Sequence, residues 1–129
     1  MNNNSAFCNV AFPQGILLTL QAPNEAFEGT TPKSFLEFIV DWEFGVLEIF
    51  QVIGQVSRQT NVPFTAVEDN IRTTASGRIE LVLPKITLCP GDGRTLVWEA
   101  LTVRSPKREG HGGSIGRTVL RFRNGELLS

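Results

Sequence analysis

Apolar and polar residues alternate most clearly over residues 35–44. Every second position is apolar: Leu36, Phe38, Val40, Trp42 and Phe44. The positions between them include Glu37, Asp41 and Glu43. Neighbouring side chains of a strand point to opposite faces, so this alternation predicts a strand with one buried face.

The period changes at Gly45. From there apolar residues follow the helical spacing i, i+3, i+4 and i+7: Val46, Ile49, Phe50, Ile53 and Val56. This spacing predicts an amphipathic helix over about residues 45–58. Gly54 inside it lowers helix propensity by about 1 kcal/mol relative to alanine, which close approach to a packed sheet would explain.

The same residues also permit one longer helix. The helical stripe extends backwards through four further apolar residues: Phe35, Phe38, Ile39 and Trp42. Thr31 and Pro32 would then serve as N-cap and first turn. We favour a strand followed by a helix, because five alternating apolar positions are hard to obtain by accident.

The rest of the chain predicts short strands and turns. Strands are expected over residues 8–12, 15–21, 78–89, 94–104 and 117–123. Pro84 indicates a bulge or a sheet edge, residues 61–77 a connection with a short helical turn, and Asn124-Gly125 a tight turn. The order predicts one α+β domain over residues 1–129, in which one central helix covers an antiparallel sheet.

Charge is distributed unevenly along the chain. Residues 1–70 contain two basic and eight acidic residues, whereas residues 71–129 contain ten basic and five acidic residues, so the halves carry −6 and +5. Two interpretations are open. The halves attract each other within one domain, or the second half presents a basic surface to a phosphate-bearing partner.

The two cysteines, Cys8 and Cys89, are too few for a disulfide framework. A bridge between them is conceivable, but free thiols in a reducing cytoplasm are the simpler interpretation. With one histidine in the chain, a zinc site is not expected. Residues 1–7 lack the features of a signal peptide, and no apolar run approaches the ~20 residues that span a bilayer. We therefore expect a cytoplasmic protein without a membrane segment.

Three segments resemble the hot-dog fold of acyl-thioester dehydratases and thioesterases. "IELVLPKITLCPGDGRTLVWEALTVR" is similar to their strand–turn–strand unit, with Pro90, Gly91 and Asp92 at the turn. "GRTVLRFRNGELLS" resembles their closing strand, and "FGVLEIFQVIGQV" their central helix. The resemblance covers about residues 35–60 and 78–129. It implies a curved sheet wrapped around one helix, a homodimer, and an acyl-CoA or acyl-carrier-protein substrate.

The resemblance also suggests where chemistry would occur. The Gly45 amide, at the helix N-terminus, would stabilise an oxyanion, and Glu48 would act as general base or nucleophile, with Asp41 as a weaker candidate. The acyl chain would contact Val46, Phe50 and Ile53. The dehydratase histidine before the helix is missing, because His111 is the chain's one histidine. This departure puts dehydration in doubt and leaves the thioesterase pattern open. Alternatively, Gly45 is a corner and Glu48 a solvated partner of the helix dipole.

A glycine-rich basic segment, "KREGHGGSIG", follows the strand predicted over residues 94–104. Lys107, Arg108 and His111 suit contacts to the phosphates of coenzyme A or a carrier arm, although the segment is not a P-loop. No metal and no cofactor are expected, and whether the chain is an enzyme is open. The alternative function is a non-catalytic module that binds a partner or a nucleic acid. Its basic stripe would contain Arg104, Lys107, Arg108, Arg117, Arg121 and Arg123, but no aromatic residues are regularly interleaved for base stacking.

Overall fold

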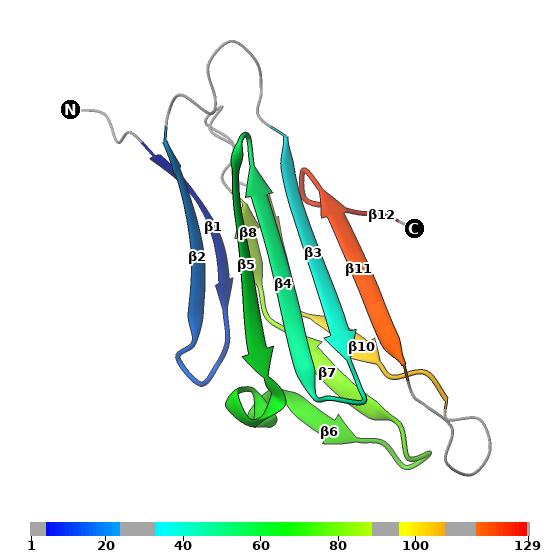
Figure 1. Cartoon of the computed structure of the whole chain (residues 1–129). Helices are drawn as coiled ribbons and strands as arrows, with labels where there is room; N and C mark the ends of the chain where they lie inside the picture. Colours follow the sequence, from blue (N-terminus) through cyan, green and yellow to red (C-terminus); the bar gives the residue numbers. More distant parts are fainter. Residues whose placement is uncertain (1–4, 24–32, 89–95, 108–115, 129) are drawn as a thin grey trace.

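The computed structural model describes residues 5–23, 33–88, 96–107 and 116–128. These residues form strands and two short 3₁₀ turns (Figure 1). In chain order the elements are β1 (Ser5–Ala11), β2 (Leu17–Pro23), β3 (Ser34–Asp41), β4 (Val46–Ile53), β5 (Val56–Pro63), η2 (Phe64–Ala66), η3 (Glu68–Asn70), β6 (Ile71–Thr73), β7 (Ile79–Leu83), β8 (Ile86–Leu88), β9 (Leu96–Trp98), β10 (Leu101–Arg104), β11 (Arg117–Arg123) and β12 (Glu126–Leu128).

The expected central helix is absent from the described part of the chain. Residues 45–58 instead belong to the hairpin of β4 and β5, which pair from Val46 with Pro63 to Ile53 with Val56. The prediction of an α+β hot-dog fold is therefore wrong, and the protein is a β-structure. Gly54 opens the two-residue loop at φ +58°, a conformation that favours glycine and that type II′ hairpins place at this position.

The sequence of β4 fits both the strand period and the helix period, because its apolar and polar residues are not separated onto opposite faces. Leu47, Ile49 and Ile53 point inward, but the fourth inward position is Gln51, a polar residue that is nevertheless fully buried. The outward positions include the apolar Phe50. Strand pairing with β3 and β5, which no local spacing reveals, decides between the two periods.

The largest sheet has the strand order β12-β11-β3-β4-β5. The predicted strand at 35–44 is confirmed as β3, although it ends at Asp41. The predicted strand at 117–123 is confirmed as β11, and it pairs with β3 from Arg117 opposite Asp41 to Arg123 opposite Phe35. Asn124 and Gly125 form the predicted tight turn, both at positive φ.

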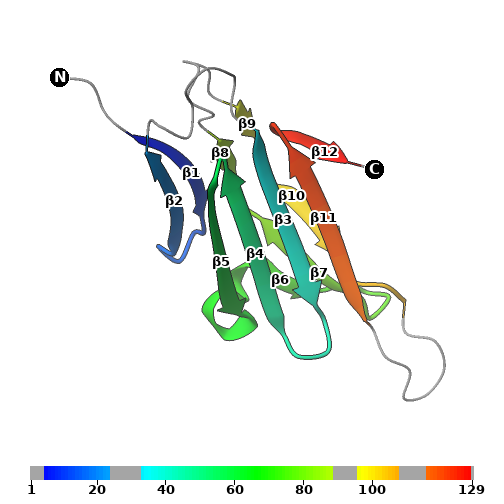
Figure 2. The same ribbon diagram turned by 45° about the horizontal axis from the view of Figure 1, so that its top comes forward.

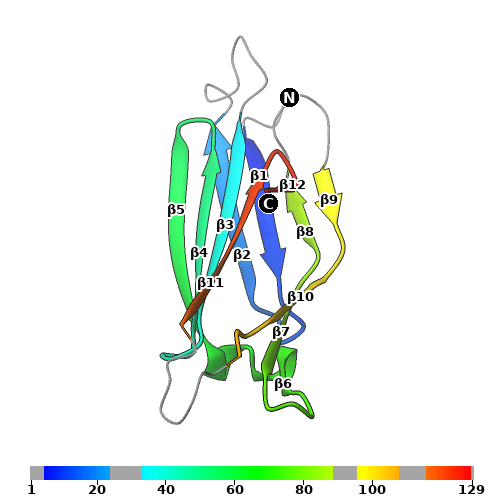
Figure 3. The same cartoon turned by 90° about the vertical axis from the view of Figure 1, so that its right-hand side faces the viewer.

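Two smaller sheets, β2-β1-β8-β9 and β10-β7-β6, form the opposite layer, as Figure 3 shows from the side. They are joined because β7 continues into β8 and β9 into β10. Pro84 lies at the first of these junctions, where its missing N–H would interrupt a continuous ladder. Figure 2 shows β7, β8 and β10 behind the five-stranded sheet, with β1 and β2 to the left of β5.

The core lies between the two layers. From the five-stranded sheet it contains Leu36, Phe38, Val40, Leu47, Ile49, Ile53 and Phe122, and from the opposite layer Val10, Leu81, Leu83, Ile86 and Val103. The Arg58 guanidinium also joins the layers, because it donates to the Thr19 carbonyl at 2.7 Å. Within the residues described, no helical segment has the length and apolar character needed to cross a lipid bilayer.

Ion pairs connect the acidic and basic halves of the chain within the large sheet. Arg117 contacts Asp41 at 3.2 Å, and Arg121 contacts Glu37 at 2.7 Å. Both pairs join β11 to β3, so part of the charge asymmetry serves attraction within the fold. These contacts also occupy two arginines of the basic stripe proposed for nucleic acid.

Candidate functional site

Gly45 and Asp41 have structural tasks in the turn between β3 and β4. The Gly45 N–H donates to the Asp41 carbonyl at 2.9 Å, so this amide is not available to an oxyanion. The Asp41 carboxylate accepts the N–H groups of Phe44 and Glu43 at 3.0 and 3.1 Å. The Phe44 N–H, assisted by Arg117, lowers the pKa of Asp41, because both stabilise the charged form. Asp41 is therefore a cap for this turn.

Glu48 lies on the outer face of the large sheet, not on a helix. It lines a shallow hollow of about 300 Å³ together with Glu37, Ile39, Phe50 and Gln59. The expected acyl-chain residues do not share one channel.

Val46 and Phe50 lie on that outer face, whereas Ile53 is fully buried in the core. Neither the oxyanion amide nor the acyl channel of the resemblance is present in this hairpin.

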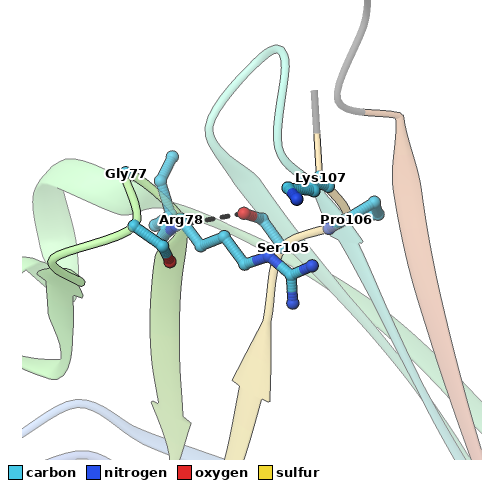
Figure 4. Close-up of a pocket in the computed structure, with 7 residues that line it drawn as sticks. Gly77, Arg78, Ser105, Pro106 and Lys107 are labelled. Carbon is cyan, nitrogen blue, oxygen red and sulfur yellow. Dashed lines mark hydrogen bonds between the residues drawn. The ribbon is translucent and has the colours of Figure 1, made fainter. Parts of the chain in front are cut away.

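Lys107 lies in a second, larger depression of about 400 Å³ (Figure 4). The remaining lining residues come from two segments that are distant in sequence: Ser76, Gly77, Arg78 and Ile79, then Ser105 and Pro106. Arg108 and His111, which were expected to act with Lys107, lie outside the described residues, as does Cys89. The depression is at the end of the molecule where β10 ends and β11 begins (Figure 1).

One wall is the turn between β6 and β7. The Gly77 N–H donates to the Thr74 carbonyl at 2.9 Å, and the Thr74 N–H donates to the Arg78 carbonyl at 2.8 Å. The Arg78 N–H donates to the Thr74 hydroxyl at 3.1 Å. Gly77 has φ +83°, which an L side chain rarely adopts, so glycine allows the turn to close here. These bonds fix the base of the Arg78 side chain.

The opposite wall continues the β7–β10 ladder beyond the end of β10. The Ser105 N–H donates to the Ile79 carbonyl at 2.7 Å, and the Ser105 hydroxyl accepts the Ile79 N–H at 3.0 Å. Ser105 is only 3% exposed. Because the hydroxyl oxygen is used as an acceptor, its proton can still be donated to a ligand. One main-chain bond and one bond to the Ser105 hydroxyl therefore hold the two walls to each other.

The charge on the depression is not compensated within the described chain. Two other arginines of this region, Arg72 and Arg104, each bind one oxygen of Glu80, at 2.6 and 2.8 Å. The hydrogen bond from Arg104 has the largest effect and that from Arg72 the next. Both lower the pKa of the Glu80 carboxyl, because they stabilise its charged form. By contrast, Arg78 and Lys107 form no ion pair with any residue that the structure describes.

The arrangement of the depression suits anion binding. Guanidinium and ammonium groups are strong donors to phosphate and sulfate oxygens.

Among the described residues, no group of three or more histidine, cysteine, aspartate or glutamate side chains is placed to hold a metal ion.

The sequence indicated Lys107 but missed Arg78. Lys107 was found because it lies in a basic, glycine-rich segment. Arg78 lies in "TASGR", whose composition predicts only a turn. Its approach to Lys107 follows from the pairing of β7 with β10, which joins Leu101 to Leu83 and Arg104 to Glu80.

Comparison of the whole chain with protein-family models, curated proteins and solved structures found no match.

Proposed function

We propose that this chain is a non-catalytic binding module that holds a phosphate or sulfate ester in the depression between the β6–β7 turn and the end of β10. The observation that carries the proposal is the convergence of Arg78 and Lys107 on one depression, without an ion pair among the described residues. An ester group there would neutralise two cations that otherwise repel each other.

The two cations would bind the ester in different ways. The planar Arg78 guanidinium can donate two parallel hydrogen bonds to two oxygens, whereas the Lys107 ammonium is a mobile point charge. The Ser105 hydroxyl supplies a third, neutral donor from the wall between them. The volume of about 400 Å³ has room for the ester and part of the group attached to it.

Binding without catalysis is the simpler assignment. The described residues that line the depression include two serines, but none of the lining residues is a histidine or a carboxylate that would activate them. Acyl-thioester handling by Glu48 remains an untested prediction, and the helix on which its mechanism depended is absent.

Calorimetric titration with inorganic phosphate, inorganic sulfate, O-phosphoserine and a phosphoserine peptide tests the proposal. We expect binding that weakens with added salt. Arg78→Ala and Lys107→Ala should each raise the dissociation constant about tenfold or more, the usual effect of losing a hydrogen bond to a charged group. Lys85→Ala is the matched control, because Lys85 is an exposed lysine outside the depression.

The ligands distinguish the source of the ester. Tighter binding of the peptide than of O-phosphoserine would indicate a modified macromolecule, and equal binding a small ester. Absence of binding for all four ligands at millimolar concentration would refute the proposal. Equal loss of binding in Arg78→Ala and Lys85→Ala would also refute it, because the effect would then be that of net charge alone.

A further inference from the structure

The outer face of the five-stranded sheet carries a group of apolar side chains, mainly on β3 and β4, beside the polar residues Ser57, Gln59 and Asn61 of β5. Its partly or fully exposed apolar side chains are Phe35, Ile39, Val46, Phe50, Val52, Val119 and Leu128. Phe50 is 37% exposed and Val119 45% exposed. An antiparallel sheet that keeps one face in water normally carries polar side chains there. Neighbouring apolar side chains of this extent indicate an interaction surface.

The same face carries charges of both signs. Glu37 is already paired with Arg121 at 2.7 Å. Glu48 on β4 and Arg123 on β11 form no ion pair with any described residue. Glu126 on β12 lies opposite Arg123 on the same face and also forms no ion pair with a described residue. The face therefore offers two acids, Glu48 and Glu126, and one base, Arg123, that are unpaired among the described residues.

The strand register places Glu48 and Arg123 symmetrically about one residue of β3. Arg123 lies opposite Phe35, and Glu48 lies opposite Ile39, both across β3. Phe35 and Ile39 are equally distant along β3 from Glu37. Glu37 therefore marks the midpoint between Arg123 and Glu48.

We propose that this face binds a second copy of the chain, in a face-to-face dimer whose two-fold axis passes near Glu37. A two-fold axis lying between the facing sheets and perpendicular to the Glu48–Arg123 line brings Glu48 of each copy to Arg123 of the other. A two-fold interface repeats each contact, so two such ion pairs form. Glu37 meets its own copy near the axis, but its charge is already neutralised by Arg121.

The hollow on this face supports the same arrangement. The hollow of about 300 Å³ is lined on one side of the axis by Glu48 and Phe50. The symmetry operation places Phe35 of one copy over this hollow in the other. An aromatic side chain is thus directed into a depression that has an apolar wall, and the contact occurs twice.

The size of the face predicts a weak dimer. From β11 to β5 it is roughly 19 Å wide, and seven residues make it roughly 24 Å long, using the usual strand spacings. The projected area of roughly 450 Å² per copy is about half of a standard interface. We therefore expect dissociation in the micromolar range, and a reversible monomer–dimer equilibrium.

Sedimentation velocity over a concentration series tests the proposal through charge reversal. Glu48→Arg and Arg123→Glu each place like charges in both contacts, so each should weaken dimerisation about tenfold or more. The double variant restores opposite charges and should recover most of the affinity. Circular dichroism of each variant checks that the fold is retained. Arg78→Glu, on the basic depression, is the control and should dimerise like the unchanged chain.

Three results would overturn the proposal. The first is an unchanged chain that stays monomeric up to several hundred micromolar, far above the dissociation constant expected here. The second is a dimer that neither single reversal weakens, which would place the interface on another surface. The third is a double variant no better than the single variants. The dimer does not depend on ester binding, so either proposal can fail alone.

Discussion

Replacing Gly54 by alanine gives opposite results for a hairpin and for a helix. In the structure Gly54 has φ +58° in the loop between β4 and β5. An L residue held in that left-handed region costs about 1–2 kcal/mol. Alanine also restricts the unfolded chain, which returns about 0.4–1 kcal/mol. The net expectation is a loss of about 1 kcal/mol in the free energy of unfolding. In the interior of a helix, the same replacement would instead gain about 1 kcal/mol.

Urea denaturation followed by tryptophan fluorescence measures this difference directly. The expected loss corresponds to a fall of roughly 3–5 °C in Tm for a chain of this size. Gly54→Asn is the matched control, because asparagine tolerates positive φ better than alanine and should cost less. Greater stability of Gly54→Ala than of the unchanged chain would refute the hairpin.

Three further predictions concern acid stability, the core and thioester chemistry. The folded-state pKa values of Asp41 and Glu80 are lowered from 3.8 and 4.5, so the stabilisation from each carboxylate is present above its unfolded pKa and is lost as the pH falls below that value. Glu80→Gln should flatten the part of an unfolding titration that begins at the higher pH. Phe38 is fully buried, so Phe38→Ala should lower the unfolding free energy by about 3–5 kcal/mol, whereas Phe50→Ala on the outer face should cost far less, as chemical denaturation would show. Glu48→Ala should leave the release of thiol from acyl-CoAs at the level of the unchanged chain, and a specific loss would return Glu48 to a catalytic role.

Strands with one clean buried face could be predicted from the sequence. Over Leu36, Phe38 and Val40 the apolar positions point inward without exception, and the pairing with β11 confirms the period. Asn124-Gly125 was also recognisable, because two consecutive residues at positive φ require this kind of sequence.

The hairpin of β4 and β5 could not be predicted in this way. Buried Gln51 and outward Phe50 gave the segment a helical spacing that its neighbours override. A local signal did exist, since Val46, Ile49, Val52, Ile53 and Val56 are β-branched and favour strands.

Only one of the two cations of the candidate site could be predicted from the sequence. Lys107 belongs to a segment rich in basic residues and glycine, which suggested phosphate contacts. Arg78 reaches the same depression only because Ile79 and Ser105 pair across β7 and β10. A contact that depends on long-range strand pairing leaves no spacing in the sequence from which it could be inferred.

The most direct test of ester binding is an amide NMR titration of the unchanged chain with O-phosphoserine. We expect the largest shifts at the amides of residues 76–79, Ser105 and Lys107, with little change at Glu48 and Phe50. The shifts should disappear in Arg78→Ala. Shifts concentrated on the outer face of the large sheet, or unchanged spectra at millimolar ligand, would contradict the assignment of this depression as an ester-binding site.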